Sequence, residues 1–277
     1  MTFEKQATTG GMTPQIKGFV LTFLGVLFVV PDSLFVRLIA ADALMIAFWR
    51  LTGAGLLIAL GLLVWQGTAP FRAVLRTGRV GLIYGLCMGL SGFFFVLAVV
   101  NTSVANVVFI IASMPVFAGL SIIAYGSGGT KGAYLTGDLM ALGVSAIFAG
   151  GLTAARRLRA VSIVAAVPMA YGAVALLILP FAAPLSLGVS QVPLAMAHGV
   201  FIALSSIFLA LGPRYITSAE VSLLVLGESI MAPLLVWLVL SEDPGPRALA
   251  GGGAVLGALM VSNTYVLLRN RSARKRH

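Results

Sequence analysis

The chain has 277 residues, of which 60% are hydrophobic and only 9% are charged, and its mean hydropathy is +1.06. A soluble domain carries about 25% charged residues, so this composition excludes the soluble globular class and predicts an all-α polytopic membrane protein. The net charge of +10 could suggest a nucleic-acid partner. However, the basic residues are scattered over short loops and the tail, and positive charge in cytoplasmic loops explains them more simply.

Nine apolar stretches are long enough to cross a bilayer as helices, which takes about 20 residues. We predict spans at 16–39, 43–65, 79–100, 103–125, 134–155, 160–183, 190–212, 218–241 and 248–268. The basic segment 66–79 is predicted to lie along the membrane surface. Residues 1–15 are polar, so no cleaved signal peptide is expected. Cys87 stands alone, so neither an intrachain disulfide nor a metal cluster is expected.

Basic residues indicate which connections face the cytoplasm. Lys17, the group 72–79, the group 156–159 and the C-terminal tail should all lie inside, with both termini in the cytoplasm of a bacterial inner membrane. This arrangement needs an even number of crossings between Arg79 and Arg156, whereas only three are visible. The charge pattern therefore predicts ten helices where nine are seen.

A weak internal repeat locates the discrepancy. At one constant offset, Ser91 aligns with Ser206, Phe93 with Phe208 and Thr102-Ser103 with Thr217-Ser218; at a similar offset, Gly18 aligns with Gly137 and Arg37 with Arg156. After Thr217 there is room for two helices, but after Thr102 there is room for only one. We predict repeats at 1–133 and 134–277, the first lacking its fifth helix near 117–123. Either part of the natural chain is missing or the protein has lost this helix, and the charge pattern favours the former.

The most specific motif runs from Tyr215 to Glu242: Tyr-Ile-Thr-Ser-Ala-Glu, an apolar run containing Gly-Glu-Ser, and a second apolar run ending in Ser-Glu. It resembles the signature of the EamA branch of the drug/metabolite transporter superfamily, as do Phe48-Trp49-Arg50 and Gly137-Asp138. The chain departs from that pattern at Ser229, where the family often has proline, at Ser241, where it has glycine, and in the missing fifth helix.

The resemblance implies ten helices in two inverted five-helix repeats around a central polar cavity, lined by the first, third, fourth, sixth, eighth and ninth helices. It implies a secondary transporter, not an enzyme, that exports amino acids or similar small metabolites by alternating access; YddG-type exporters are one branch. Facilitated diffusion or drug efflux by a carrier of the same superfamily is the alternative. The expected partners are the substrate, the bilayer and, as a candidate coupling ion, the proton. No cofactor is expected, and the chain is expected to act as a monomer.

Ionisable residues inside the spans are the first candidates for chemistry, because a buried charge usually faces a polar interior rather than lipid. Glu228 lies near mid-membrane, where it could bind a substrate ammonium group, carry a coupling proton, or simply bond a neighbouring helix. Asp32 and Arg50 lie at similar depth in consecutive spans and could form a structural ion pair. Alternatively, Asp32 could line the cavity beside Pro31, because proline frees a backbone carbonyl.

Polar residues also share helix faces at seven- and four-residue spacings. These groups are His198 and Ser205; Tyr84, Ser91 and Phe95; Asn106 and Ser113; and Ser222 and Ser229. Polar stripes on separate helices suit a cavity for substrate binding, although each serine alone is explained by close helix packing. Pro31, Pro115, Pro168 and Pro233 all interrupt predicted spans. Of these, Pro31, Pro115 and Pro233 are the candidate hinges.

Two further residues have local explanations. Arg37 is expected to extend towards the outer interface of the membrane. Thr217-x-x-Glu220 is the capping-box pattern, in which each side chain satisfies a backbone N–H at the helix start.

An intramembrane serine protease is the competing class. Gly89-Leu-Ser91-Gly92 resembles the Gly-x-Ser-Gly of rhomboid proteases, and Ala197-His198-Gly199 resembles their catalytic-histidine helix. However, several spans separate Ser91 from His198, and Ser91 has a repeat partner in Ser206. A purely structural scaffold is the third class, and the ionisable residues inside the spans argue against it.

Overall fold

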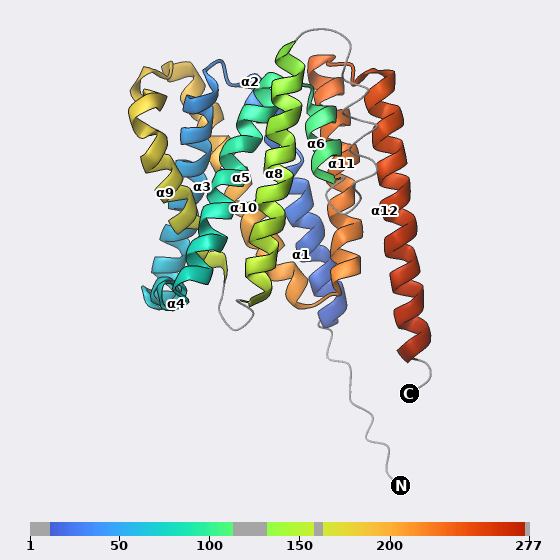
Figure 1. Ribbon diagram of the computed structural model, residues 1–277. Helices are drawn as coiled ribbons and strands as arrows, with labels where there is room; N and C mark the ends of the chain where they lie inside the picture. The colour runs from blue at the N-terminus through green and yellow to red at the C-terminus, as the bar shows by residue number, and fades with distance from the viewer. Residues whose placement is uncertain (1–11, 113–131, 158–162, 275–277) are drawn as a thin grey trace.

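The computed structural model describes residues 12–112, 132–157 and 163–274, and within these ranges the regular structure is helical, without strands. The helices form one bundle, in which the long ones run side by side (Figure 1). The described helices, short ones included, are α1 (Pro14–Val29), α2 (Asp32–Leu38), α3 (Ala43–Gln66), α4 (Ala69–Arg76), α5 (Arg79–Asn101), α6 (Val104–Ala112), α8 (Gly132–Arg157), α9 (Ala166–Ala182), α10 (Val192–Leu211), α11 (Ser218–Leu240) and α12 (Gly245–Arg274). Short 3-10 turns occur at η1 (Ile163–Ala165), η2 (Pro184–Ser186), η3 (Val189–Gln191) and η4 (Gly212–Arg214).

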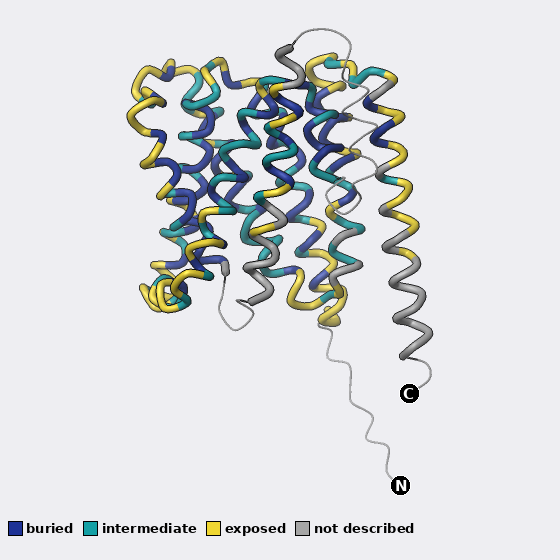
Figure 2. The backbone as a smooth tube through the Cα atoms, viewed as in Figure 1, coloured by how far each residue is buried: buried dark blue, intermediate teal, exposed yellow. Residues whose placement is uncertain are grey.

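Within the described residues, five stretches are long and apolar enough to cross a membrane: Pro14–Leu38, Ala43–Gln66, Arg79–Asn101, Val189–Arg214 and Leu223–Leu240. Buried residues lie where the helices face one another, and exposed residues line the outside of the bundle (Figure 2). The exposed positions include large apolar side chains such as Trp65, Leu176 and Leu238. An all-helical bundle with an apolar exterior satisfies its backbone hydrogen bonds internally, as a bilayer requires. The fold is therefore that of a membrane-embedded helical protein.

The observed elements refine the predicted spans. The span predicted at 16–39 is two helices, because the chain turns at Val30 and Pro31 before α2 begins. The predicted surface segment forms α4, which lies across the lower ends of its neighbours in Figure 1. The span predicted at 103–125 is described only to Ala112, and the region 117–123, where a fifth helix is expected, lies outside the described residues.

The predicted hinges have different outcomes. Pro31 does stand at a helix break, as N-cap of α2. Pro233 lies inside α11, which continues as one helix to Leu240, so it does not interrupt its span. Pro168 lies in the first turn of α9, where proline is tolerated, so it does not interrupt its span either. Pro115 lies outside the described residues.

Charge is divided between the two ends of the bundle. The short basic helix α4 lies at the lower end in Figure 1, and both α8 and α12 end there, at Arg157 and Arg274. The acidic turn between α11 and α12, with Glu242 and Asp243, lies at the upper end. The N-terminal end of α1 also lies at the lower end. The start of α1, the helix α4 and the ends of α8 and α12 therefore lie at one end of the bundle, opposite the turn with Glu242 and Asp243.

The crossing of α3 and α10 positions the candidate site. Gly53 and Gly199 face each other there: a Cβ added to Gly199 would lie 2.9 Å from the Cα of Gly53. Small residues allow membrane helices to approach this closely. Consequently the residues beside these glycines, Arg50 one turn away and His198 next in sequence, are brought into the same layer of the bundle.

Candidate functional site

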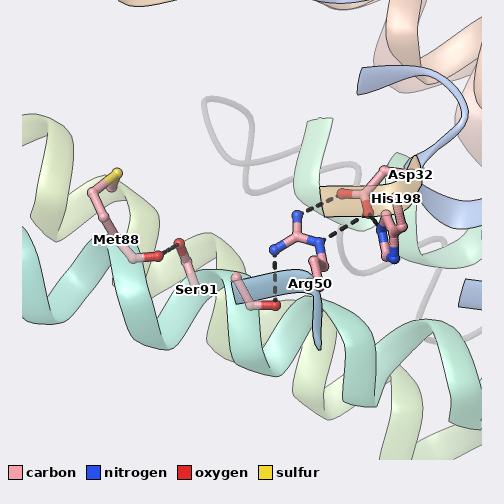
Figure 3. Close-up of polar contacts among 6 residues, drawn as sticks. Asp32, Arg50, Met88, Ser91 and His198 are labelled. Atoms are coloured by element: carbon pink, nitrogen blue, oxygen red, sulfur yellow. Dashed lines mark hydrogen bonds and ion pairs between the residues drawn. The ribbon is translucent and has the colours of Figure 1, made fainter. Parts of the chain in front are cut away.

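A buried charged cluster joins α2, α3 and α10 (Figure 3). The Arg50 guanidinium donates to both carboxylate oxygens of Asp32, from Nε to Oδ1 at 2.9 Å and from Nη2 to Oδ2 at 2.6 Å. The Nε2 atom of His198 lies 2.6 Å from the same Oδ1. The exposed fractions are 2% for Asp32, 6% for Arg50 and 0% for His198, so the whole cluster is shielded. The predicted Asp32–Arg50 pair is confirmed, and His198 is an additional member.

Local backbone features place each member. The break between α1 and α2 at Pro31 makes Asp32 the first residue of α2, inside the bundle. On α5, the Gly92 carbonyl accepts from Arg50 Nη1 at 3.5 Å. A Cβ added to Gly92 would lie only 2.9 Å from that Nη1, so the absence of a side chain at this position leaves room for the guanidinium.

Aromatic rings enclose the cluster. Phe35 stacks on the His198 ring, with centroids 5.2 Å apart and an interplanar angle of 17°. The Arg50 guanidinium carbon lies 5.5 Å from the centroid of the Phe95 ring, within cation–π range. The Tyr171 ring of α9 reaches the same place, because a Cβ added to Gly92 would lie 3.8 Å from Tyr171 Cε1. Phe95, predicted from its helix face, is thus part of the site, together with Phe35 and Tyr171, which the sequence did not single out.

The cluster is electrically balanced when His198 is neutral. The charges of Asp32 and Arg50 cancel, and neutral His198 then donates from Nε2 to Asp32; this tautomer is assigned from the hydrogen-bond network. The other ring nitrogen of His198, Nδ1, is buried and has no hydrogen-bond partner among the described residues. A balanced, geometrically good pair is the form in which a buried carboxylate is stable.

Glu228 of α11 is a further carboxyl group beside this cluster. Its side chain is half-buried, whereas Asp32 and Arg50 are buried. Its charge interacts with those of Asp32 and Arg50, and α11 packs against α2. No hydrogen bond to Glu228 occurs among the described residues. Glu228 therefore places a half-buried carboxyl group beside the buried pair.

The remaining predicted residues divide into several groups. Ser205, Ser229 and Tyr84 are buried in the bundle. The hydroxyl of Ser91 donates to the Met88 carbonyl of its own helix at 2.9 Å (Figure 3). Ser113 lies outside the described residues, and so does the side chain of Ser222.

Ser91 and His198 are thus engaged with different partners, Met88 and Asp32. The described residues contain no hydrogen bond between them, although a serine nucleophile needs such contact with its base.

Asn106 belongs to a second polar cluster rather than to the first. Asp138 of α8 accepts at Oδ1 from the Thr102 hydroxyl at 2.8 Å and from Asn106 Nδ2 at 3.4 Å. Asn106 Nδ2 also lies 3.4 Å from Thr102 Oγ1. In the sequence, Asp138 stands out only as part of the Gly137-Asp138 motif. Its position as the seventh residue of the apolar helix α8 is the signal for a buried carboxyl group.

Arg37 does not extend alone to the interface. Its Nε lies 3.0 Å from Glu242 Oε2, and its Nη2 donates to the Thr102 carbonyl at 2.8 Å. Glu242 also accepts from the backbone N–H of Val104 at 3.0 Å, so this pair ties α2 to the start of α6 and the end of α11.

The predicted capping box of α11 is confirmed. The Thr217 N–H donates to Glu220 Oε2 at 2.7 Å, and the Glu220 N–H donates to Thr217 Oγ1 at 3.4 Å. Gln15 also donates to Glu220 Oε1 at 3.0 Å. The carboxylate of Glu220 therefore serves the local helix start.

No protein-family model and no curated protein match this chain. A solved crystal structure, described only as that of a protein, is similar in fold: it is 17% identical with a TM-score of 0.64, and the match covers 91% of this chain and 98% of that chain. At this level of identity, the similarity shows a shared fold and nothing about activity.

Proposed function

We propose that the chain is a secondary transporter that moves a small molecule by alternating access around the Asp32–Arg50–His198 cluster and Glu228. The observation that carries the proposal is the half-buried Glu228 of α11 beside a buried charged cluster. The Asp32 member of that cluster lies at the break between α1 and α2. Ionisable groups inside a membrane bundle mark substrate and ion pathways, and discontinuous helices are a feature of transporter binding sites.

The helix packing supports a design of two inverted repeats, at 1–133 and 134–277. The first helix of each half packs on the other half: α1 on α10 and α11, and α8 on α5 and α6. Likewise α3 packs on α10, and α9 packs on α5. Helices at corresponding positions of the two halves run in opposite directions in Figure 1, as the first helices, α1 and α8, show. Such exchange of helices between inverted halves is the architecture in which one half can rock against the other.

Two glycines at corresponding positions make corresponding contacts. A Cβ added to Gly18 would lie 2.6 Å from Tyr215 Cβ, just before α11. A Cβ added to Gly137 would lie 2.7 Å from Thr102 N, just before α6. The weak sequence repeat, which aligns Gly18 with Gly137 and Thr102 with Thr217, therefore has a spatial counterpart that supports the two-repeat proposal.

The chemistry of Glu228 and Phe95 favours a substrate with an ammonium group. Glu228 offers a carboxylate, and Phe95 contributes an aromatic surface near the cluster. Amino acids and similar small metabolites have this chemistry, in keeping with the resemblance to the EamA branch. In this proposal the protein lies in a bacterial inner membrane with its basic ends in the cytoplasm. A drug-efflux or facilitated-diffusion carrier is the alternative within the same architecture.

Uptake into proteoliposomes across an amino-acid panel, with and without a pH gradient, tests the proposal. We expect at least one solute to move faster than in protein-free vesicles, and Glu228→Gln to reduce that rate about tenfold or remove its dependence on the gradient, as expected for about 1.4 kcal/mol of lost interaction. The control is Asp243→Asn, because Asp243 is an exposed residue of the upper turn.

Unchanged rate and pH dependence in Glu228→Gln would show that Glu228 has no part in transport. If no solute of the panel moves above the protein-free background, amino-acid transport itself is wrong. Transport that ignores the pH gradient in the unsubstituted protein would favour facilitated diffusion.

A further inference from the structure

The Asp138 carboxylate has one oxygen without a partner. Asp138 is 3% exposed, so water does not solvate it freely. Its Oδ1 accepts from Thr102 and Asn106, whereas its Oδ2 is buried and accepts no hydrogen bond from any described residue. A buried carboxylate oxygen without a donor or a cation is strongly destabilising, so this oxygen indicates a missing ligand.

The charge at this place is not balanced by a side chain. No lysine or arginine of the described ranges forms an ion pair with Asp138. Arg37 reaches the same junction, where it donates to the Thr102 carbonyl, but its charge is matched by Glu242. Among the described residues, no cation compensates the charge that an ionised Asp138 carboxylate brings into the bundle.

The ends of two helices, α5 and α6, meet beside this cluster. α5 ends at Asn101, and Thr102 follows in an extended conformation with φ −144° and ψ 175°. α6 begins at Val104, so the negative carboxyl end of α5 and the positive amino end of α6 oppose each other here. Gly137 allows α8 to touch this end, because a Cβ added there would lie 2.7 Å from the carbonyl carbon of Asn101. The close contact at Gly137 therefore places Asp138, the next residue, beside the end of α5.

We propose that Asp138, Thr102 and Asn106 bind one monovalent metal cation, of the sodium type. The carboxylate of Asp138 and the hydroxyl oxygen of Thr102 are hard oxygen ligands, and the Asn106 amide presents a third oxygen when it is turned about its last bond. A single positive charge neutralises Asp138, whereas a divalent ion would leave a buried surplus of one charge. The sequence predicted no metal site, and it is the unpartnered oxygen that points to this one.

Thermal unfolding of the purified full-length protein in detergent tests the site. The unfolding temperature is measured at neutral pH and constant ionic strength while sodium chloride replaces choline chloride. We expect a saturable rise of about 2–4 °C, because a ligand that binds only the folded state stabilises it. Asp138→Asn should abolish the rise and keep the hydrogen bond to Thr102. The matched control is Asp42→Asn, where an exposed carboxylate caps α3 through Leu44 N and Met45 N at 3.0 Å.

A second variant keeps the test decisive if Asp138→Asn does not fold. Thr102→Val removes the hydroxyl ligand while retaining the shape and the carboxylate, and it should raise the sodium concentration for half of the effect about tenfold, equivalent to about 1.4 kcal/mol. The proposal is overturned if sodium and choline act alike on the unsubstituted protein, if Asp138→Asn or Thr102→Val responds as the unsubstituted protein does, or if only pH changes the unfolding temperature, which would assign a proton to Asp138. None of these outcomes depends on solute transport.

Discussion

Asp32 and Asp138 are buried to the same degree, with 2% and 3% of their surfaces exposed, but their charges are compensated differently. Asp32 meets a cation and a histidine, so every part of its carboxylate has a partner. Within the part of the chain that the structure describes, Asp138 meets only a hydroxyl and an amide, through one of its two oxygens. Burial alone therefore does not define the role of a carboxyl group in a membrane bundle. The partner that supplies the opposite charge, whether a side chain or a ligand, defines it.

The largest expected effect comes from removing the cation beside Asp32. Arg50→Ala would make Asp32 resemble Asp138, a buried carboxylate with neutral donors only. We expect a loss of about 3–5 kcal/mol in stability, because breaking a buried pair leaves an uncompensated charge. Thermal unfolding in detergent measures it. The double variant with Asp32→Asn should recover part of the loss; a double variant no more stable than Arg50→Ala would contradict this explanation.

Separating the helices that carry the cluster should have a smaller effect. Gly199→Ala places a Cβ 2.9 Å from Gly53 Cα, a backbone atom that cannot move aside cheaply. We expect a loss of about 1–3 kcal/mol from overpacking and a weaker contact between His198 and Asp32.

Gly172→Ala is the matched control for that variant, because it too replaces a helical glycine but its Cβ would meet nothing within 4 Å. Alanine has the better helix propensity, so this variant should be as stable as the unsubstituted protein or slightly more so. Equal unfolding temperatures for Gly199→Ala and Gly172→Ala would show that the Gly53–Gly199 contact is not needed.

The smallest expected effect concerns a carboxylate at the bundle end. Glu220→Ala removes one side of the capping box, so we expect a loss of about 0.5–2 kcal/mol. Glu220→Gln should retain most of the stability, since glutamine also serves in a capping box. A loss in Glu220→Gln as large as in Arg50→Ala would mean that the charge of Glu220 matters as much as that of the Asp32 pair.

Much of the fold could be predicted from the sequence, because length, apolar runs and caps are local properties. These determined the helical segments, the surface helix α4, the break at Pro31 and the capping box of α11. The possible pairing of Asp32 with Arg50 followed from their depth in consecutive spans, since a short connection brings such positions together.

The tertiary structure alone decided which residues share each cluster. The contacts of His198 with Asp32, of Arg37 with Glu242 and of Asp138 with Thr102 join residues far apart in the chain. Lipid is as apolar as the bundle interior, so hydrophobic pattern does not reveal which face of such a helix turns inward. That rotation is set by close contacts such as Gly53 with Gly199, and these exist only once the helices are packed.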